Sequence, residues 1–151
     1  MRISTMEEKV AIVTGSSQGI GKAVALRLGA ERMSVVVNYR SAKDAAEEVV
    51  AEIGAAGGRA VAVGADVTEE GAIAGLFEVA EREFGGLDVL ISNVGLNVPS
   101  PLAEATDEDY DLVFGTNVRA TFVAMREAAR RIRDGGRIVS ISSGAAVMAR
   151  A

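Results

Sequence analysis

Three glycines near the amino terminus have the spacing of a loop that binds phosphate groups. Gly15, Gly19 and Gly21 form a G-x-x-x-G-x-G pattern in VAIVTGSSQGIGKAVALRL, between an apolar run and a segment of helical period. Such glycines allow a tight turn and bring the main chain close to a diphosphate at the amino end of the helix. A plain tight connection has the same glycines, so the prediction depends on the flanking strand and helix patterns.

The same stretch excludes the P-loop of nucleoside triphosphatases. Five residues separate Gly15 from Gly21, where that motif has four. Ala23 stands where a serine or threonine would hold magnesium. The stretch therefore favours dinucleotide binding over ATP hydrolysis.

The end of the second apolar run, NYRS, indicates which dinucleotide binds. It has no Asp or Glu to accept a hydrogen bond from a ribose 2'-hydroxyl. Arg40 is able to pair with a 2'-phosphate instead, and Asn38 and Ser41 would add hydrogen bonds. The alternative is an exposed arginine that leads into a helix. The segment therefore favours NADP(H), with NAD(H) as the second choice.

The composition removes several kinds of chemistry. The 151 residues include no cysteine and no histidine, which excludes disulfides, thiolate zinc sites and Cys or His nucleophiles. The net charge of -5 comes from interleaved acids and bases, so no basic stripe is present for nucleic acid or an anionic membrane. The amino-terminal segment is polar and no apolar run spans a membrane. We expect a cytoplasmic protein without metal, nucleic-acid or membrane partners.

Short β-branched runs alternate with segments of helical period, which is typical of βαβ units. Strands are expected at residues 9–14, 34–39, 59–66, 87–92 and 136–142, and helices at 19–30, 41–56, 69–84 and 107–133. Thr106 and Asp109 are expected to cap the fourth helix, and Gly135 and Gly136 to end it. Right-handed crossovers predict an α/β fold, a Rossmann-type doubly wound parallel sheet of order 3-2-1-4-5, in one domain of residues 1–151.

Five signals stand in one order along the chain: TGSSQGIG at 14–21, DV at 66–67, SNVG at 92–95, an asparagine in GTNVRA, and RIVSISS at 137–143. Together they resemble the short-chain dehydrogenase/reductase family, and within it the 3-oxoacyl-carrier-protein reductase and glucose dehydrogenase type. The resemblance covers nearly the whole chain. It implies hydride transfer between a nicotinamide cofactor and a small-molecule carbonyl or alcohol, with 3-oxoacyl thioesters as one substrate class.

The resemblance also implies the residues that contact the cofactor. Asp66 and Val67 would lie beside the adenine, although an acid at a strand end is equally a turn residue. The family usually has Asn-Asn-Ala-Gly where this chain has SNVG, and a glycine where Arg32 stands, so Arg32 is expected in a left-handed cap. The expected cofactor-binding residues are Gly15, Ser17, Gly19, Ile20, Gly21, Asn38, Tyr39, Arg40, Ser41, Asp66, Val67, Asn93 and Gly95.

Two residues are expected to take part in the reaction. By resemblance, Asn117 holds a water in a proton relay, and Ser143 steadies the substrate carbonyl as it becomes an alkoxide. Without the resemblance, Asn117 would fix a local helix distortion and Ser-Ser-Gly would be ordinary turn chemistry. The helical pattern also predicts that Asn117 shares a sheet-facing side with Tyr110 and Phe114.

The family's reaction also needs a Tyr-x-x-x-Lys pair, expected roughly a dozen residues beyond Ser143 and so past Ala151. Tyr39 and Tyr110 are the chain's only tyrosines, and neither is expected to substitute. We therefore expect a shortened chain with the cofactor half of the enzyme. A non-catalytic dinucleotide-binding module and a non-functional fragment stay as alternatives. An exposed fifth strand would favour association, and the resemblance implies a homo-oligomer for an intact chain.

Overall fold

Five parallel strands form one sheet in the computed structural model, which describes residues 9–144. The strands are β1 (Val10–Val13), β2 (Ser34–Tyr39), β3 (Arg59–Gly64), β4 (Leu87–Ser92) and β5 (Ile132–Ser140). The helices are α1 (Gly19–Ala30), α2 (Lys43–Ala55), α3 (Ala72–Phe84), α4 (Asp107–Phe114), the π-helix η2 (Gly115–Arg119) and α5 (Ala120–Arg131). The strand order is β3-β2-β1-β4-β5, so the expected doubly wound, Rossmann-type sheet is confirmed.

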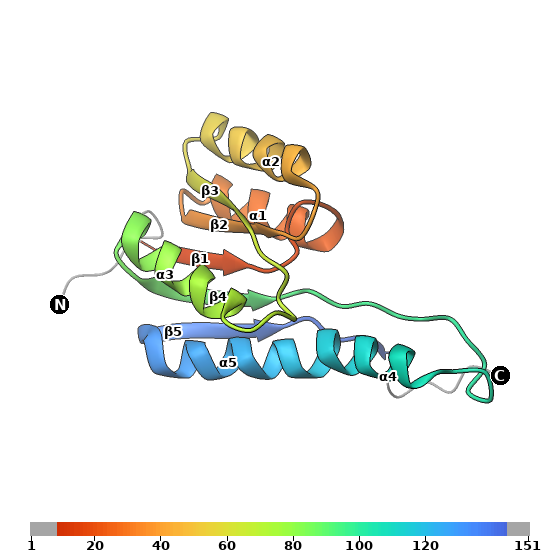
Figure 1. Cartoon of the computed structure of the whole chain (residues 1–151). Helices are drawn as coiled ribbons and strands as arrows, with labels where there is room; N and C mark the ends of the chain where they lie inside the picture. Colours follow the sequence, from red (N-terminus) through yellow and green to blue (C-terminus); the bar gives the residue numbers. More distant parts are fainter. Residues whose placement is uncertain (1–8, 145–151) are drawn as a thin grey trace.

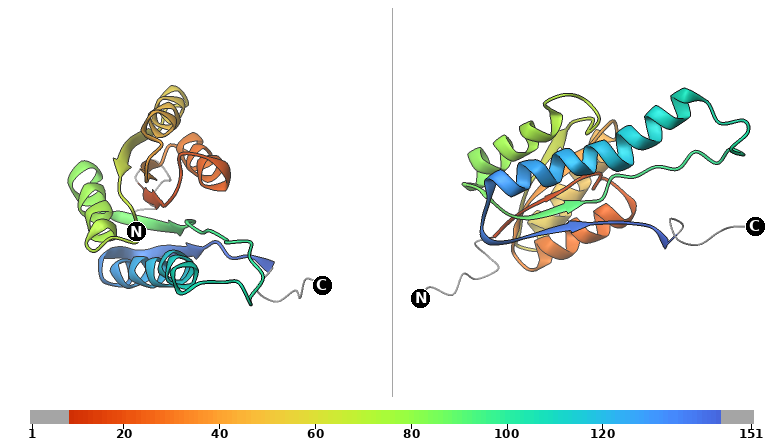
Figure 2. Two further views of the ribbon diagram at one scale, coloured as in Figure 1. Left: turned by 45° about the vertical axis from the view of Figure 1, so that its right-hand side comes forward. Right: turned by 90° about the horizontal axis from the view of Figure 1, so that it is seen from below.

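Helices cover both faces of this sheet (Figures 1 and 2). The α1 and α2 helices pack on one face, and α3 and α5 pack on the other. Successive side chains of a strand point to opposite faces, so Val35 and Val37 join the core under α1 and α2 while Val36 joins the core under α3 and α5. Both cores therefore include residues of β1 and β2. This packing fixes the two strands, and with them the loops that follow their carboxyl ends.

The boundaries of the first three helices lie close to the expected ones. The α3 helix begins at Ala72 and not at residue 69, because Gly71 before it takes a left-handed conformation with φ of 78°. Arg32, in the turn after α1, has φ of 62°. This confirms the left-handed cap expected there, which costs about 1 kcal/mol for a residue other than glycine.

The fourth expected helix, 107–133, is wrong as one continuous α-helix. Its start is confirmed: Thr106 Oγ1 accepts a hydrogen bond from Asp109 N at 3.1 Å, and Asp109 Oδ2 accepts one from Thr106 N at 3.1 Å. The π-helix η2 then interrupts it for five residues. A π-turn inserts an extra residue and so rotates the two flanking faces against each other. Tyr110 and Phe114 are 58% and 45% exposed and do not face the sheet, because α4 buries none of its residues and extends beyond the strands (Figure 2).

The two glycines expected to end that helix lie inside β5. The helix stops at Arg131, and Ile132 already has extended dihedral angles. The strand pairing shifts between Leu87 and Val89 of β4. Gly135 has φ of 77°, and a side chain on Gly136 would lie 2.7 Å from a carbonyl oxygen of β4. The glycine pair therefore forms a bulge in a strand and not a helix cap.

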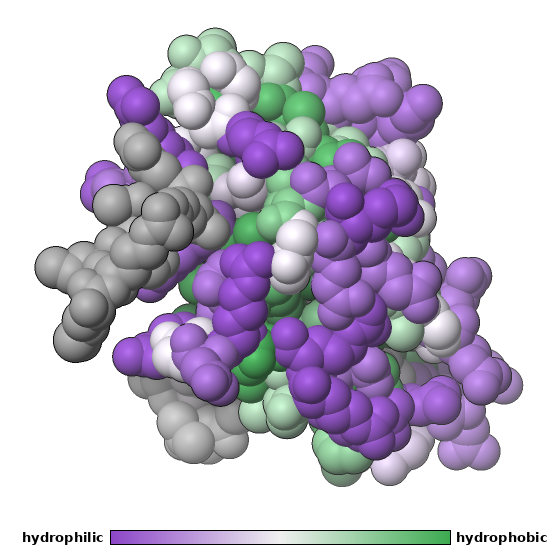
Figure 3. Space-filling view, turned by 90° about the vertical axis from the view of Figure 1, so that its left-hand side faces the viewer, coloured by the Kyte–Doolittle hydropathy of each residue, from purple (hydrophilic) through white to green (hydrophobic). Residues whose placement is uncertain are grey.

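The surface at the amino ends of the strands is largely hydrophilic, with hydrophobic residues visible between the polar ones (Figure 3). No helix within residues 9–144 has the length and apolar character needed to cross a membrane. Residues 1–8, which belong to the polar amino-terminal segment, lie outside the described residues.

Candidate functional site

A cavity of about 250 Å³ lies at the carboxyl ends of β1, β2, β3 and β4. Here β1 has β2 on one side and β4 on the other, so the connections diverge to opposite faces and leave a crevice. Its lining residues are Gly15, Ser17, Gln18, Asn38, Tyr39, Arg40, Ser41, Ala42, Ala65, Asp66, Val67, Thr68, Val94, Gly95, Leu96 and Thr116. The cavity therefore gathers nine of the expected cofactor residues from four separate loops.

The glycine loop has the geometry of an anion cradle. Gly15 and Gly19 have φ of 60° and 57°, and a side chain on Gly19 would meet no atom within 4 Å. A side chain on Gly21 would lie 2.3 Å from the carbonyl oxygen of Gly15, so α1 packs this closely only because the residue is glycine. The N-cap residue Gln18 makes no side-chain hydrogen bond to α1. The first-turn N–H groups therefore lack a side-chain cap and are suited to an anionic ligand.

Asn93 supports the glycine loop and does not line the cavity as expected. Its Nδ2 donates to the carbonyl oxygens of Thr14 at 2.9 Å and Gly15 at 3.1 Å. Thr14 Oγ1 in turn accepts hydrogen bonds from the main-chain N–H groups of Asn93 at 2.9 Å and Val94 at 3.2 Å. The neighbouring Val94 and Gly95 line the cavity instead. The side chain of Asn93 is turned to the loop because these two carbonyls need a donor there.

Asn38 also lies differently from the expectation. Only 1% of this residue is exposed. Its Oδ1 accepts a hydrogen bond from Gly15 N at 3.0 Å, and its Nδ2 donates to Ala65 O at 3.0 Å. The expected hydrogen bond from Asn38 to a 2'-phosphate is therefore corrected, since the amide is already used inside the protein. Gly15 N–H is likewise not exposed toward a diphosphate.

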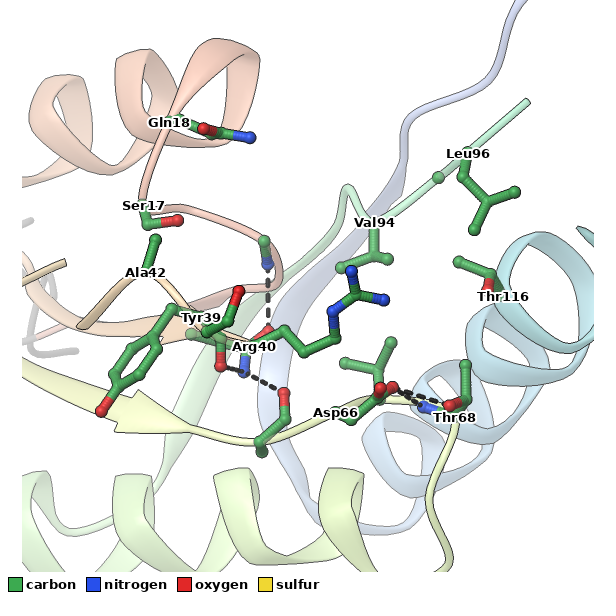
Figure 4. Close-up of a pocket in the computed structure, with 16 residues that line it drawn as sticks. Ser17, Gln18, Tyr39, Arg40, Ala42, Asp66, Thr68, Val94, Leu96 and Thr116 are labelled. Atoms are coloured by element: carbon green, nitrogen blue, oxygen red, sulfur yellow. Dashed lines mark hydrogen bonds between the residues drawn. The ribbon is translucent and has the colours of Figure 1, made fainter. Parts of the chain in front are cut away.

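Arg40 lies at the exposed end of β2. Figure 4 shows its side chain reaching across the cavity toward Val94 and passing above Asp66. Ser41 lines the same part of the cavity. The ring of Tyr39 packs against Gly64, where an added side chain would lie 3.0 Å from it. Arg40 is thus the exposed cation at this end of the cavity, and its pairing with a 2'-phosphate stays a prediction.

Asp66 forms a local turn with Thr68 (Figure 4). Asp66 Oδ1 accepts hydrogen bonds from Thr68 Oγ1 at 2.7 Å and Thr68 N at 2.9 Å. The side-chain hydrogen bond from Thr68 is the main reason why the pKa of Asp66 lies below its ordinary value, followed by the main-chain hydrogen bond and the charge of Arg40. The carboxylate stays ionised at neutral pH. This geometry is that of a turn residue at a strand end, which was the alternative to a contact with the adenine.

Four expected cofactor residues do not line the cavity: Gly19, Ile20, Gly21 and Asn93. Ile20 is 63% exposed at the start of α1. Sequence reasoning missed Gln18, Ala42, Ala65, Thr68, Val94, Leu96 and Thr116. Only Thr68 left a signal, because Asp-x-Thr is a common turn sequence. Each of the other six residues is adjacent in the sequence to a predicted site residue and lines the cavity for that reason.

Asn117 lies within η2 and joins that helix to the loop after β4. Its Oδ1 accepts a hydrogen bond from Leu96 N at 2.9 Å, and its Nδ2 donates to Leu96 O at 2.8 Å. Leu96 and the neighbouring Thr116 both line the cavity. The side chain therefore holds one wall of the cavity in position, at the point where the helix is distorted. Ser143 is exposed and follows β5 by three residues.

A family model described as short chain dehydrogenase matches residues 9–151. The chain belongs to the short-chain dehydrogenase family. It is 51% identical over 140 residues to the hydroxynaphthalene reductase-like protein Arp2 of Metarhizium brunneum. That match covers 93% of this chain and 52% of the relative.

Solved members of the family have the same fold. A short chain dehydrogenase from Burkholderia cenocepacia J2315 in complex with NADP superposes with a TM-score of 0.93 at 39% identity, covering 98% of this chain and 60% of that one. The landomycin C-6 ketoreductase LanV, solved with bound NADP and rabelomycin, has a TM-score of 0.90 at 37% identity, covering 97% and 62%. This chain thus spans between half and two thirds of their lengths. The expected 3-oxoacyl-carrier-protein reductase or glucose dehydrogenase type stays a prediction.

Within residues 9–144 no group of His, Cys, Asp and Glu side chains is arranged to hold a metal ion.

Proposed function

We propose that this chain binds NADP(H) and forms the cofactor-binding part of an oxidoreductase that acts on a carbonyl or alcohol. One observation carries the proposal: Gln18, the N-cap residue of α1 without a side-chain cap bond, and the exposed cation Arg40 both line the cavity at the switch point of the sheet. A dinucleotide with a 2'-phosphate has an anionic group for each of them. The similar Burkholderia and LanV structures, both solved with NADP, support the same choice of cofactor.

The residues divide between the two ends of this ligand. The main-chain N–H groups that begin α1 would hold the diphosphate, and Arg40 with Ser41 would hold the 2'-phosphate. Asp66 and Val67 border the part of the cavity that would take the adenine. Asn38 and Asn93 would shape the loop and not contact the ligand. The nicotinamide, when bound, supplies or accepts the hydride.

Two further polar residues, Ser143 and Asn117, are proposed to act at the reacting end of the site. We infer that Ser143 donates a hydrogen bond to the oxygen of the substrate carbonyl, which gains negative charge during reduction. Asn117 would hold the Leu96 loop against the cofactor and keep η2 in its distorted form. Its amide is already bonded to Leu96 at both ends, so any contribution to a proton relay would come from the main chain that it positions.

Calorimetric titration of the 151-residue chain with NADPH and with NADH tests the cofactor assignment. We expect NADPH to bind at least about tenfold more tightly, because a charge-assisted contact to the 2'-phosphate contributes about 1.5–3 kcal/mol. Equal affinities would overturn the preference for NADP(H). Absence of binding by both would overturn the proposed function.

Two substrate classes follow from the resemblance and from the similar proteins. The resemblance implies 3-oxoacyl thioesters. The names of the similar proteins, a hydroxynaphthalene reductase-like protein and a C-6 ketoreductase with bound rabelomycin, favour a ketone of a fused-ring aromatic compound. Consumption of NADPH with one compound of each class, followed by its absorbance, distinguishes them.

The second candidate function is a dinucleotide-binding module without catalysis. The positions of the two tyrosines favour it, because a proton donor for the carbonyl must reach the substrate. Tyr110 stacks on Phe114 with ring centroids 4.2 Å apart on an exposed helix face, and the ring of Tyr39 packs on Gly64. Turnover of either substrate class by the chain would oppose the module.

We also propose that residues 1–151 form one domain that associates with a second copy through the outer face of α4, η2 and α5. Large apolar side chains are exposed along it, namely Phe114, Val118, Phe122 and Met125. Acidic residues begin α4 at 107–109, whereas Arg130 and Arg131 end α5. An antiparallel two-fold pairing would therefore bring opposite charges together. A monomer by light scattering at every protein concentration would contradict this.

A further inference from the structure

The buried side-chain amide of Asn38 connects three segments that surround the proposed cofactor site. Its Oδ1 accepts a hydrogen bond from Gly15 N, in the glycine loop, at 3.0 Å. Its Nδ2 donates to Ala65 O at 3.0 Å and to Val63 O at 3.3 Å, at the exit of β3. A further contact of 3.3 Å reaches the carbonyl oxygen of the next residue, Tyr39. One side chain thus joins the ends of β1, β2 and β3.

The partners fix the orientation of this amide. Gly15 N–H is a donor and must face the oxygen, while the carbonyls of Val63 and Ala65 are acceptors and must face the NH₂ group. An apolar side chain of the same size would remove the hydrogen bonds that Gly15 N–H and Ala65 O make with this amide. An ionised carboxylate would place a second acceptor against two carbonyl oxygens. Among uncharged and charged side chains of this length, the amide alone meets both requirements at neutral pH.

The main chain of the same residue holds the next position of the loop. Asn38 O accepts a hydrogen bond from Ser16 N at 2.8 Å and lies 3.5 Å from Ser16 Oγ. The single hydroxyl proton of Ser16 is donated to Val13 O at 2.7 Å. Gly15 and Ser16 are therefore both anchored to β2, immediately before the turn that leads into α1. Any shift of Asn38 would move the start of α1.

We propose that Asn38 is a positioning residue that sets the shape of the glycine loop and couples it to the adenine side of the site. The inference rests on the proposed cofactor function, but it assigns Asn38 no contact with the cofactor. One buried amide thus fixes the position of the glycine loop, at the diphosphate end of the site, relative to the end of β3, at its adenosine end. Loss of that amide would therefore weaken binding of the whole dinucleotide, and not only of the 2'-phosphate.

The substitution Asn38→Asp gives a pH-dependent test. An ionised carboxyl there repels the two carbonyls, whereas a neutral carboxyl accepts from Gly15 N–H and donates to Ala65 O. Burial and the facing carbonyls raise the pKa of the introduced carboxyl. The affinity for NADP⁺, measured by calorimetry, should be about tenfold or more below that of the unsubstituted chain near pH 8 and recover to within about threefold near pH 5.5.

The background for this measurement is favourable. The chain has no histidine, and the pKa of Asp66, the acid beside Ala65, is lowered, so it stays ionised throughout. The nearest charged side chain along the strand is the guanidinium of Arg40, two residues beyond Asn38. The 2'-phosphate itself titrates near pH 6. The quantity compared at each pH is therefore the affinity of the variant for NADP⁺ divided by that of the unsubstituted chain. The exposed Asn97→Asp is the matched control, and its ratio should not change with pH.

Hydrogen exchange in the unsubstituted chain without ligand tests the same inference independently of any variant. The amide protons of Gly15 and Ser16 should exchange slowly, whereas those of Gly19 and Ile20 should exchange fast until NADP⁺ is added. Fast exchange at Gly15 would overturn the proposal, as would an affinity ratio for Asn38→Asp that is independent of pH. If the unsubstituted chain does not bind NADP⁺ while Gly15 is protected, the proposed function fails and the positioning role of Asn38 stands.

Discussion

Replacing Gly21 with alanine tests the packing of α1 on the glycine loop. The added Cβ would lie 2.3 Å from the carbonyl oxygen of Gly15, 2.7 Å from Asn93 Nδ2 and 2.9 Å from Ser16 Cα. Two of these three atoms belong to the main chain, so a side-chain rotation does not relieve the overlap. Separating α1 from the loop should cost about 3 kcal/mol, at the upper end of overpacking substitutions. For a chain of this size, that lowers the unfolding midpoint by about 6–12 °C.

Gly54→Ala is the matched control for this substitution. Gly54 lies in α2, it is exposed, and an added side chain would meet no atom within 4 Å. Alanine there should raise the free energy of unfolding by about 0.5–1 kcal/mol, since glycine is unfavourable inside a helix. Thermal unfolding followed by circular dichroism measures both variants, and calorimetry measures their affinity for NADPH. If Gly21→Ala behaves like Gly54→Ala in both measurements, the close-packing argument is refuted.

Three further substitutions test other contacts. Arg40→Ser should weaken NADPH binding about 10- to 100-fold and leave NADH within about threefold, because only NADPH has the 2'-phosphate; equal losses would contradict its role. Asn117→Leu should cost about 2–3 kcal/mol in urea unfolding and speed exchange of the Leu96 amide proton, since two main-chain groups lose their partner. Glu81→Gln should cost about 0.5–1 kcal/mol at pH 7, because the Arg131 pair is partly exposed. Its hydrogen bond with Arg131 lowers the pKa of Glu81, so this stabilisation exists above the ordinary glutamate pKa and is lost as pH falls through the lowered one, and the two chains should converge in acid.

Much of the fold follows from local sequence patterns. The apolar runs that form β2 and β4 and the helical period of α1 gave their bounds directly, because a buried parallel strand and an amphipathic helix differ in length and period. For the π-turn at 115–119 the one signal was Asn117, for which a local helix distortion was the alternative to a proton relay. It depends on the clamp between Asn117 and Leu96, residues 21 positions apart. Gly135 and Gly136 matched a helix end equally well, and only the pairing with β4 decides that they form a bulge.

The candidate site was likewise only partly predictable from the sequence. The conformations of Gly15 and Gly19 and the position of Arg40 follow from motif spacing and strand order. The roles of Asn38 and Asn93 do not, because both amides bond to main-chain groups far along the chain, up to 27 residues from Asn38 and 79 residues from Asn93. A motif predicts that a polar residue stands beside the cavity. Whether it faces the ligand or the protein depends on which main-chain groups lack a partner, and that is a property of the assembled sheet.

The ties from Asn93 to Thr14 and Gly15 have a consequence for synthesis on the ribosome. A growing chain that has released only β1, β2 and β3 already contains all three loop glycines, yet it lacks Asn93, 78 to 79 positions later, which bonds to the carbonyls of Thr14 and Gly15. Pairing of β1 with β4 is equally distant, and such non-local pairing slows folding. At about 5–20 residues per second, the nascent cradle waits for several seconds before it can close. Binding of the coenzyme would therefore have to wait until Asn93 has emerged, and it would not guide the first folding steps.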